Sequence, residues 1–186
     1  MTADEILAIY AEQGSGAYLG EPVSVSEHAL QSAYFAEAAG ASGALVLAAL
    51  LHDIGHLIEQ APNDIGEWKS DAQHELTGSR WLARRFGPEV SEPVRLHVPA
   101  KRYLCATEPS YANALSAASV ITLKLQGGPM SPAETEAFEA EAYWREALLV
   151  RRCDDQGKLQ GLRTPDFDHD RALIQRWATA PPQAAG

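Results

Sequence analysis

One uninterrupted apolar stretch, ALVLAALL at residues 44–51, constrains this chain more than any other feature. A helix made of these residues is apolar on every face, which is typical of a helix buried at the centre of a domain. The stretch is far shorter than the roughly 20 apolar residues that a membrane-spanning helix needs. We therefore expect a protein that folds around this segment and does not enter a membrane.

The remaining sequence predicts further helices, separated by clusters of Gly, Pro and Ser. No segment shows the alternation of polar and apolar residues that marks a strand. The predicted class is all-α, as a single domain over residues 1–186, with an N-terminal helix within 1–14 and a frayed tail at 180–186. The expected helices cover residues 3–13, 26–39, 43–59, 71–86, 92–104, 110–125, 131–151 and 169–178, with loops at 14–25 and 60–70. The expected N-caps include Ser26, Ser42, Ser131 and Asp168.

Charge and cysteine content exclude several classes of protein. The 15 Lys and Arg residues are outnumbered by 25 Asp and Glu residues, which gives a net charge of −10. An acidic surface argues against nucleic acid or an anionic membrane as the main partner. Two cysteines, Cys105 and Cys153, cannot form a disulfide framework. Asp4 and Glu5 precede any apolar stretch, unlike a signal peptide, so we expect a cytoplasmic protein.

The end of the buried helix carries an adjacent pair, His52 and Asp53, within LLHDIGH. Burying both side chains is costly unless each is satisfied. A metal ion satisfies both, because a neutral imidazole offers a nitrogen lone pair and a carboxylate can bridge two ions. The alternative is that the two residues simply form hydrogen bonds with each other or with a neighbouring helix.

The other histidines and one aspartate strengthen the metal interpretation, because they complete an ordered set. Four imidazoles and two carboxylates from five separate segments can build a two-metal centre with open positions, which one histidine alone cannot. A further histidine, His56, is placed on the same helix face as the His-Asp pair. The ordered set is His28, His52, Asp53, His74, His97 and Asp154.

Seven stretches of the chain resemble the HD-domain superfamily, and within it the mixed-valent diiron oxygenases of organophosphonate catabolism. The resemblance runs from Tyr18 to Gly157. A bare HD dipeptide is a weak signal, whereas HDIGH, AKRYL and QGGPM together are specific to this branch. The matching stretches are YLGE (18–21), EHALQSAYFAE (27–37), VLAALLHDIGH (46–56), QHE (73–75), HVPAKRYL (97–104), QGGPM (126–130) and RRCDDQGK (151–158).

The resemblance implies two iron ions per chain, in the Fe(II)/Fe(III) state. It assigns His74 and His97 to the second ion, with Asp53 as the bridge between the two. It assigns the first ion to His28, His52, Asp53 and Asp154.

The resemblance also implies a substrate site and a lid. Tyr18 and Glu21 match a catalytic lid pair, in which the Tyr occupies the open iron position until substrate arrives and the Glu partners it or the amino end of the substrate. The resemblance also counts Lys101 among the catalytic residues. Lys101 lies one helical turn after His97, so both side chains are expected on the same face of the helix. The residues expected to contact the phosphonate are His56, Lys101, Ser119, Gln126 and Arg151.

The implied reaction is O2-dependent cleavage of the carbon–phosphorus bond of 1-hydroxy-2-(trimethylammonio)ethylphosphonate, giving glycine betaine and phosphate. The free amine, 2-amino-1-hydroxyethylphosphonate, giving glycine, is the first alternative. Loop 60–70 carries Asp64, Glu67 and Trp68, with Asp71 just after, and an acidic, aromatic segment favours the quaternary cation. The substrate is expected to come from an upstream 1-hydroxylating oxygenase.

Three other functions stay open from the sequence. A metal-dependent HD phosphohydrolase would use a metal-bound water as nucleophile and consume no O2. A polyol oxygenase similar to inositol oxygenase would need no phosphonate site. A degenerate HD domain would serve only as a binding module.

Overall fold

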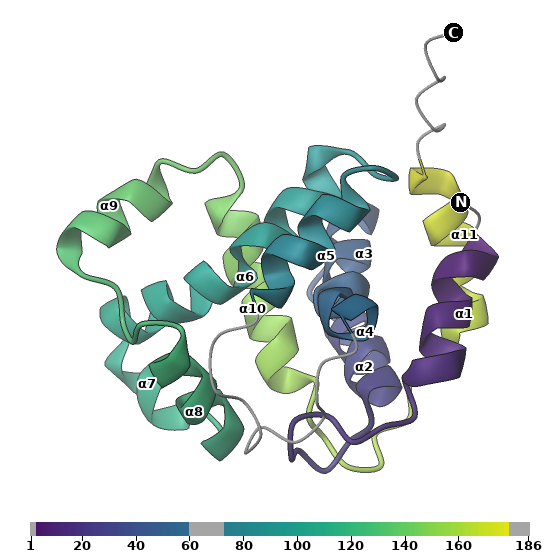
Figure 1. The fold of residues 1–186 in the computed structure, drawn as a ribbon, viewed down its shortest axis with the longest axis horizontal. Helices are drawn as coiled ribbons and strands as arrows, with labels where there is room; N and C mark the ends of the chain where they lie inside the picture. The colour runs from purple at the N-terminus through teal and green to yellow at the C-terminus, as the bar shows by residue number, and fades with distance from the viewer. Residues whose placement is uncertain (1–2, 60–72, 179–186) are drawn as a thin grey trace, which may run out of the picture.

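The computed structural model describes residues 3–59 and 73–178, and every regular element within them is a helix. The predicted all-α class is therefore confirmed. The predicted loop at 60–70, the helix start at Asp71 and the tail at 180–186 lie outside the described residues. The helices are α1 (Ala3–Gln13), α2 (Val25–Ala38), α3 (Gly43–Leu51), α4 (Ile54–Glu59), α5 (His74–Leu82), α6 (Pro88–Thr107), α7 (Pro109–Ala114), α8 (Ala117–Leu125), α9 (Pro132–Glu139), α10 (Trp144–Gln156) and α11 (Phe167–Trp177) (Figure 1).

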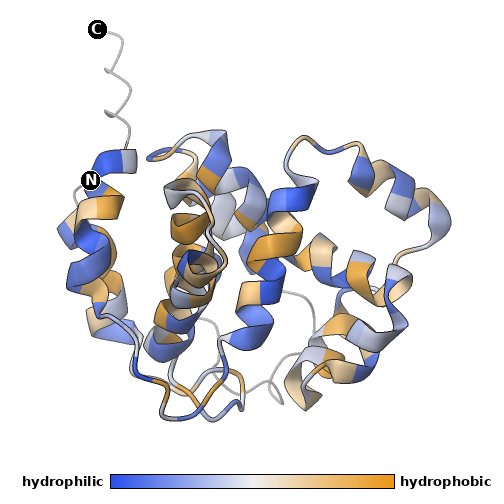
Figure 2. Ribbon diagram, turned by 180° about the vertical axis from the view of Figure 1, so that it is seen from behind, coloured by the Kyte–Doolittle hydropathy of each residue, from blue (hydrophilic) through white to orange (hydrophobic). Residues whose placement is uncertain are grey.

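Helix α3 lies at the centre of the fold, as its composition predicts. Leu47, Leu50 and Leu51 have no exposed surface, and α3 packs against α2, α6, α10 and α11. Its predicted N-cap is present, because the Ser42 side chain accepts the backbone N–H of Leu45. Figure 2 shows the apolar residues concentrated on the inner helices.

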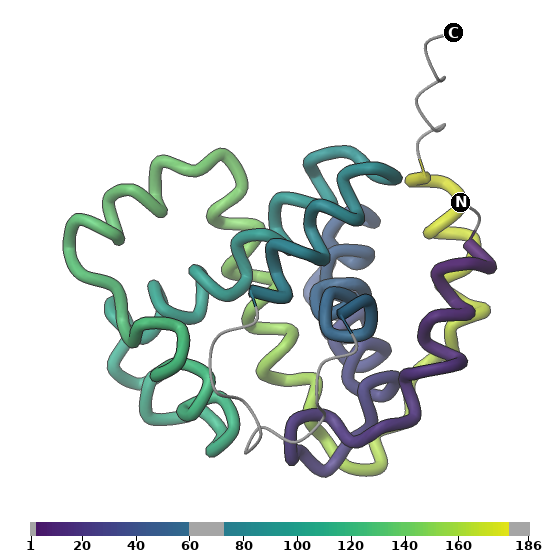
Figure 3. The backbone as a smooth tube through the Cα atoms, viewed as in Figure 1, coloured from purple at the N-terminus to yellow at the C-terminus, as the bar shows by residue number. Residues whose placement is uncertain are grey.

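Helices from the two ends of the chain cover one flank of this core. Figures 1 and 3 show α1 and α11 side by side, on the side opposite α7, α8 and α9. Tyr10 of α1 ties this flank to the central helix by donating to the Leu50 carbonyl at 2.9 Å. A single domain spanning residues 1–186 stays a prediction, because both ends lie outside the described part of the chain. Within the described ranges, no helix is long and apolar enough to cross a membrane.

Three predicted helices are each divided in two. The segment 43–59 breaks at His52 and Asp53, so α4 follows α3 after a turn. The segment 110–125 breaks before Ser116, whose side chain caps a new helix, α8. The segment 131–151 breaks after Glu139, where α9 ends. Apolar periodicity continues across each break, so the sequence pattern hides the change of direction.

Several predicted helix ends are also wrong. Ser24, not Ser26, caps α2, because it forms a capping box with Glu27. Asp166, not Asp168, caps α11. Helix α6 begins at Pro88, earlier than the predicted residue 92, and it contains two internal prolines. Proline normally interrupts a helix, so the sequence underestimates its length.

Candidate metal centre and anion pocket

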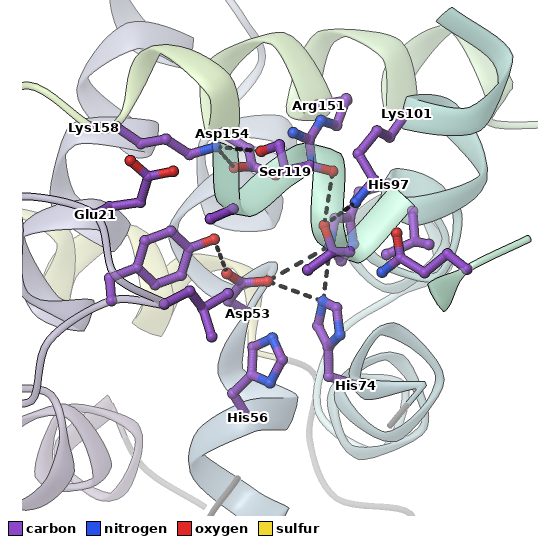
Figure 4. Close-up of a pocket in the computed structure, with 16 residues that line it drawn as sticks. Glu21, Asp53, His56, His74, His97, Lys101, Ser119, Arg151, Asp154 and Lys158 are labelled. Carbon is purple, nitrogen blue, oxygen red and sulfur yellow. Dashed lines mark hydrogen bonds and ion pairs between the residues drawn. The ribbon is translucent and has the colours of Figure 1, made fainter. Parts of the chain in front are cut away.

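The structure brings all six predicted metal ligands into one buried cluster. Figure 4 shows part of this cluster, with Asp53, His74, His97 and Asp154 labelled. They come from α2, the turn after α3, the first residue of α5, and the interiors of α6 and α10. The break between α3 and α4 matters here, because it turns His52 and Asp53 toward the other helices. The most exposed of the six, Asp53, has only 7% of its surface accessible.

The first histidine pair consists of His28 and His52. Their Nε2 atoms lie 3.2 Å apart. The Nδ1 atom of His28 donates to the Gly157 carbonyl at 2.8 Å, and that of His52 donates to the Ala49 carbonyl at 2.8 Å. A carbonyl only accepts, so each Nδ1 carries the proton and each Nε2 presents a lone pair to the cluster.

Asp154 completes this first group. One of its oxygens, Oδ1, lies 3.5 Å from the Nε2 atom of His28. Arg151 donates to the other oxygen, Oδ2, at 2.6 Å. Although burial opposes it, the cations Arg151 and Lys158 hold the pKa of Asp154 far below its usual range. The carboxylate is therefore ionised and able to bind a cation.

The second histidine pair consists of His74 and His97, whose Nε2 atoms lie 3.1 Å apart. The Nδ1 atom of His97 donates to the Val94 carbonyl at 2.7 Å, which again leaves Nε2 as the lone-pair atom. Asp53 lies between the two pairs. Its Oδ1 is 3.1 Å from Nε2 of His74, and its Oδ2 is 3.4 Å from Nε2 of His52. Each oxygen of this carboxylate therefore faces a different pair.

The donor set fits two metal ions. Two nitrogens bound at about 2.1 Å to one ion, at a right angle, lie about 3 Å apart, close to the spacing within each pair. Burial lowers the pKa of His28 to about 4, which keeps it neutral as a ligand. Oδ1 of Asp154 is buried and has no hydrogen-bond partner among the described residues. An ion between the imidazoles satisfies this oxygen and the facing lone pairs.

A pocket with several cations on its wall adjoins this cluster. Lys101 is 2% exposed, and its Nζ donates to Thr122 Oγ1 at 2.7 Å. Burial lowers the pKa of Lys101 to about 7, and the nearby Arg151 adds to the effect. The Oγ atom of Ser119 lies 3.1 Å from Nζ of Lys158. These side chains give the pocket wall the positive charge and hydrogen-bond donors that suit an anion.

All five predicted phosphonate contacts line this pocket, namely His56, Lys101, Ser119, Gln126 and Arg151. The Gln126 Oε1 atom is buried without a hydrogen-bond partner among the described residues. The His56 ring stacks on His74, with ring centroids 3.8 Å apart.

Arg151 also forms hydrogen bonds with residues other than Asp154. Its Nε donates to Tyr111 Oη at 2.9 Å and to Asp155 Oδ2 at 3.1 Å. Lys158 was not predicted to line the pocket; it lies just past the end of α10, with its Nζ 3.6 Å from Asp154 Oδ1. Tyr111 was not predicted either, because the sequence holds no signal for its contact with Arg151.

The predicted lid pair also lies at the pocket. The Tyr18 hydroxyl donates to Asp53 Oδ2 at 2.7 Å, and its ring stacks on His28 with centroids 3.8 Å apart. Burial, and then the negative charge of Asp53, raise the pKa of Tyr18, so it keeps its proton. Glu21 lines the same pocket. The predicted acidic and aromatic contacts from Asp64, Glu67, Trp68 and Asp71 lie outside the described residues.

The fold and the clustered His and Asp residues define an HD domain, and the family match agrees. The HD-domain family model matches residues 25–154. This chain therefore belongs to the HD-domain family.

Two similar proteins are named as phosphonate dioxygenases. The chain is 42% identical to a protein of Leisingera caerulea named [1-hydroxy-2-(trimethylamino)ethyl]phosphonate dioxygenase (glycine-betaine-forming), over 90% of this chain and 86% of the relative. It is 44% identical to a hydroxymethylphosphonate dioxygenase of Gimesia maris, over 85% of this chain and 79% of the relative. The family predicted from the motifs is confirmed.

Proposed function

We propose that this protein is a non-haem diiron dioxygenase that cleaves the carbon–phosphorus bond of 1-hydroxy-2-(trimethylammonio)ethylphosphonate with O2, giving glycine betaine and phosphate. The strongest structural support is the position of Asp53, which faces both histidine pairs beside a cation-lined pocket. The names of both relatives describe dioxygenases of 1-hydroxyphosphonates.

In this proposal the two ions are iron, in the Fe(II)/Fe(III) state. Iron, once bound, supplies the redox chemistry with O2 that amino-acid side chains cannot perform. His74 and His97 hold the second ion together with Asp53, which bridges to the first. The first ion is held by His28, His52, Asp53 and Asp154.

The chain's own residues bind and orient the phosphonate. Lys101 supplies a point charge, and Ser119 and Gln126 supply hydrogen bonds. His56 adds a contact from the wall beside His74. Arg151 fixes Asp154 through the 2.6 Å contact and lines the same pocket. Several fixed donors aimed at one oxyanion orient carbon 1 of the substrate toward the metal cluster.

The lid pair controls access to the first ion. Tyr18 donates a hydrogen bond to Asp53 and stacks on His28, so its phenol stands where the substrate's 1-hydroxyl is to bind. Arrival of the substrate displaces the phenol. Glu21 then faces the positive end of the substrate.

The overall balance fixes how much O2 is consumed. The alcohol carbon becomes a carboxylate and the phosphonate becomes phosphate. Each of these products gains one oxygen atom, so one O2 is consumed for each carbon–phosphorus bond broken. The 1-hydroxyl must already be present, and we propose that an upstream 1-hydroxylating oxygenase supplies this substrate. We further propose that the protein works in the cytoplasm.

Two related substrates are the alternatives. The free amine, 2-amino-1-hydroxyethylphosphonate, would give glycine and phosphate by the same balance. The relative at 44% identity is named for hydroxymethylphosphonate, which has no cationic end. Glu21, an acidic residue on the pocket wall, favours a substrate that carries a positive charge.

A comparison of the three compounds tests the proposal. Iron-loaded protein is given each compound, with O2 uptake measured by electrode and phosphate release measured alongside. We expect the trimethylammonio compound to have the highest kcat/KM, with equal amounts of O2 consumed and phosphate released. A higher kcat/KM for the free amine or for hydroxymethylphosphonate contradicts the assigned substrate. Phosphate release from a phosphate ester under anoxia, with Mn²⁺ or Mg²⁺, supports a phosphohydrolase instead.

A further inference from the structure

One hydroxyl joins the lid loop to the helix that carries the anion-binding side chains. Ser116 is the N-cap of α8, and its Oγ accepts the backbone N–H of Ser119 at 3.1 Å. The same hydroxyl donates to Oε1 of Glu21 at 2.5 Å. Ser116 therefore fixes both the first turn of α8 and the position of a lid carboxylate that is distant in the sequence.

The turn that carries Glu21 is strained and is held at both ends. Leu19 and Gly20 both have positive φ angles, 48° and 80°, a conformation that a leucine rarely adopts. Such a turn persists only where its surroundings hold it. Tyr18 is anchored on Asp53 at one end, and Glu21 is anchored on Ser116 at the other.

Glu21 is a carboxylate on the pocket wall whose charge has no ion-pair partner in the described part of the chain. Among the described residues, no Lys, Arg or His forms an ion pair with it, and its Oε2 accepts no hydrogen bond. Lys158 lines the same pocket, but its Nζ lies 3.6 Å from Asp154 and 3.5 Å from Asp155. The charge of Lys158 is therefore balanced by those two residues.

The pocket thus has an anion-binding side and a carboxylate side. Figure 4 shows Glu21 and Lys101 on opposite sides of the pocket. Ser119 lies on α8, one helical turn after the serine that holds Glu21. A substrate with a phosphonate at one end and a cation at the other complements this arrangement.

We propose that Ser116 is a specificity-determining positioning residue, which holds Glu21 where it meets the cationic end of the substrate. This inference rests on the proposed function, because it assumes a phosphonate at Lys101 and Ser119. Without the hydroxyl, Glu21 loses its fixed position and the strained turn loses one anchor. Cationic substrates then bind less well, whereas hydroxymethylphosphonate, which has no cationic end, is unaffected.

The substitution Ser116→Asp separates the two roles of this serine. Aspartate caps a helix as well as serine does, but at neutral pH its carboxylate cannot donate to Glu21 and repels it. Ser116→Thr keeps both the cap and the donor. Ser116→Gly, which is also accepted at an N-cap, removes the donor without adding charge. Ser131→Asp is the matched control, because Ser131 caps α9.

The experiment uses the full iron-loaded chain. The KM of the trimethylammonio compound is compared with the binding constant of hydroxymethylphosphonate, measured as a KM or as a competitive Ki. We expect Ser116→Asp and Ser116→Gly to raise the first constant about tenfold, as loss of a hydrogen bond to a charged group does. The second constant should stay within about twofold, as should both constants in Ser116→Thr and Ser131→Asp. Iron content should be the same in all variants.

Other outcomes overturn the inference. Equal changes for both compounds mean that Ser116 only stabilises α8, and unchanged constants mean that Glu21 needs no anchor. A wild-type enzyme that prefers hydroxymethylphosphonate to both aminated compounds leaves the oxygenase function standing but removes the role of Ser116. A wild-type protein that oxidises none of the three compounds contradicts the proposed function itself.

Discussion

Asp53 is the residue on which both histidine pairs depend. Its Oδ2 faces the pair that contains His52, and its Oδ1 faces the pair that contains His74. Although burial opposes it, His52, and then His74 and His97, hold the pKa of the Asp53 carboxyl well below its usual range. A fully ionised carboxylate with two oppositely directed oxygens is the group that a bridged metal pair requires.

Replacing Asp53 by alanine should therefore remove at least one of the two iron ions from the chain and abolish turnover. Metal analysis after anaerobic loading and an O2-uptake assay measure both effects. Asp170→Asn is the control, because Asp170 is similarly buried but lies on α11, away from the cluster. Activity retained in Asp53→Ala contradicts the bridging role.

Lys101 should give the enzyme a pH-dependent affinity for its anionic substrate. Burial places its pKa at about 7, so its amine is charged below this pH and neutral above it. We expect kcat/KM to fall as the pH rises above about 7. In Lys101→Arg the guanidinium stays charged, so this decline should disappear. Lys101→Ala should raise KM at all pH values while iron content is unchanged.

The test of the Lys101 prediction is a pH profile of kcat/KM for the wild type and both variants. A decline at high pH that persists unchanged in Lys101→Arg assigns it to another group. An Ala variant that has lost iron shows that Lys101 supports the metal cluster rather than the anion.

For single residues, the sequence predicted which side chains form the site better than it predicted the contacts between them. The six candidate ligands lie together and the five candidate phosphonate contacts line one pocket, as the resemblance carried by the motifs implies. Ser116 and Tyr111 were not predicted. Their partners, Glu21 and Arg151, are distant in the sequence, and no local pattern encodes such a contact.

Among the helices, the break between α3 and α4 is the feature that positions two candidate metal ligands, His52 and Asp53. Gly55 follows this break, and a Cβ atom added there would lie 2.0 Å from the His74 carbonyl oxygen. Backbone therefore meets backbone where α4 packs on α5, and only glycine allows it. This contact sets the distance between Asp53 and His74.

The substitution Gly55→Ala should push α4 away from α5. We expect a loss of stability of about 1–3 kcal/mol, as for other overpacked sites, together with loss of iron from the second position. Thermal unfolding and metal analysis measure these effects. Gly161→Ala is the control for iron content, since its Cβ would meet nothing within 4 Å. Its φ of +74° strains an alanine, so this variant should lose stability but keep its iron. Full iron content in Gly55→Ala would show that the close approach is unrelated to the metal cluster.

Most of the helices were predicted from the sequence, whereas the breaks within them were not. Caps at Ser42 and Ser131 mark helix starts because they act locally. The divisions at residues 52–53 and 115–116 result from packing between distant helices, so the local pattern does not show them.

Over the whole molecule, the candidate metal cluster joins elements that are far apart in the sequence. Helices α2, α5, α6 and α10 each contribute a ligand, and the turn after α3 contributes two. The all-α class follows from composition and periodicity. How these helices surround α3 follows only from the packing of the complete chain.

Bound metal should therefore stabilise the entire fold. An ion present at a thousand times its Kd adds about 4 kcal/mol to the free energy of unfolding, or roughly 10 °C in Tm for a domain of this size. We expect chelation to lower Tm by this order in the wild type and by much less in Asp53→Ala. Differential scanning calorimetry measures it. An unchanged Tm after complete iron removal contradicts this coupling.

The central claim is that these six side chains hold a pair of iron ions bridged by Asp53. Electron paramagnetic resonance of partly reduced protein, quantified against total iron, tests it most directly. We predict two irons per chain and a signal from a spin-coupled Fe(II)/Fe(III) pair, which is absent from Asp53→Ala. One iron per chain, or the signal of an isolated Fe(III) ion only, would contradict the claim.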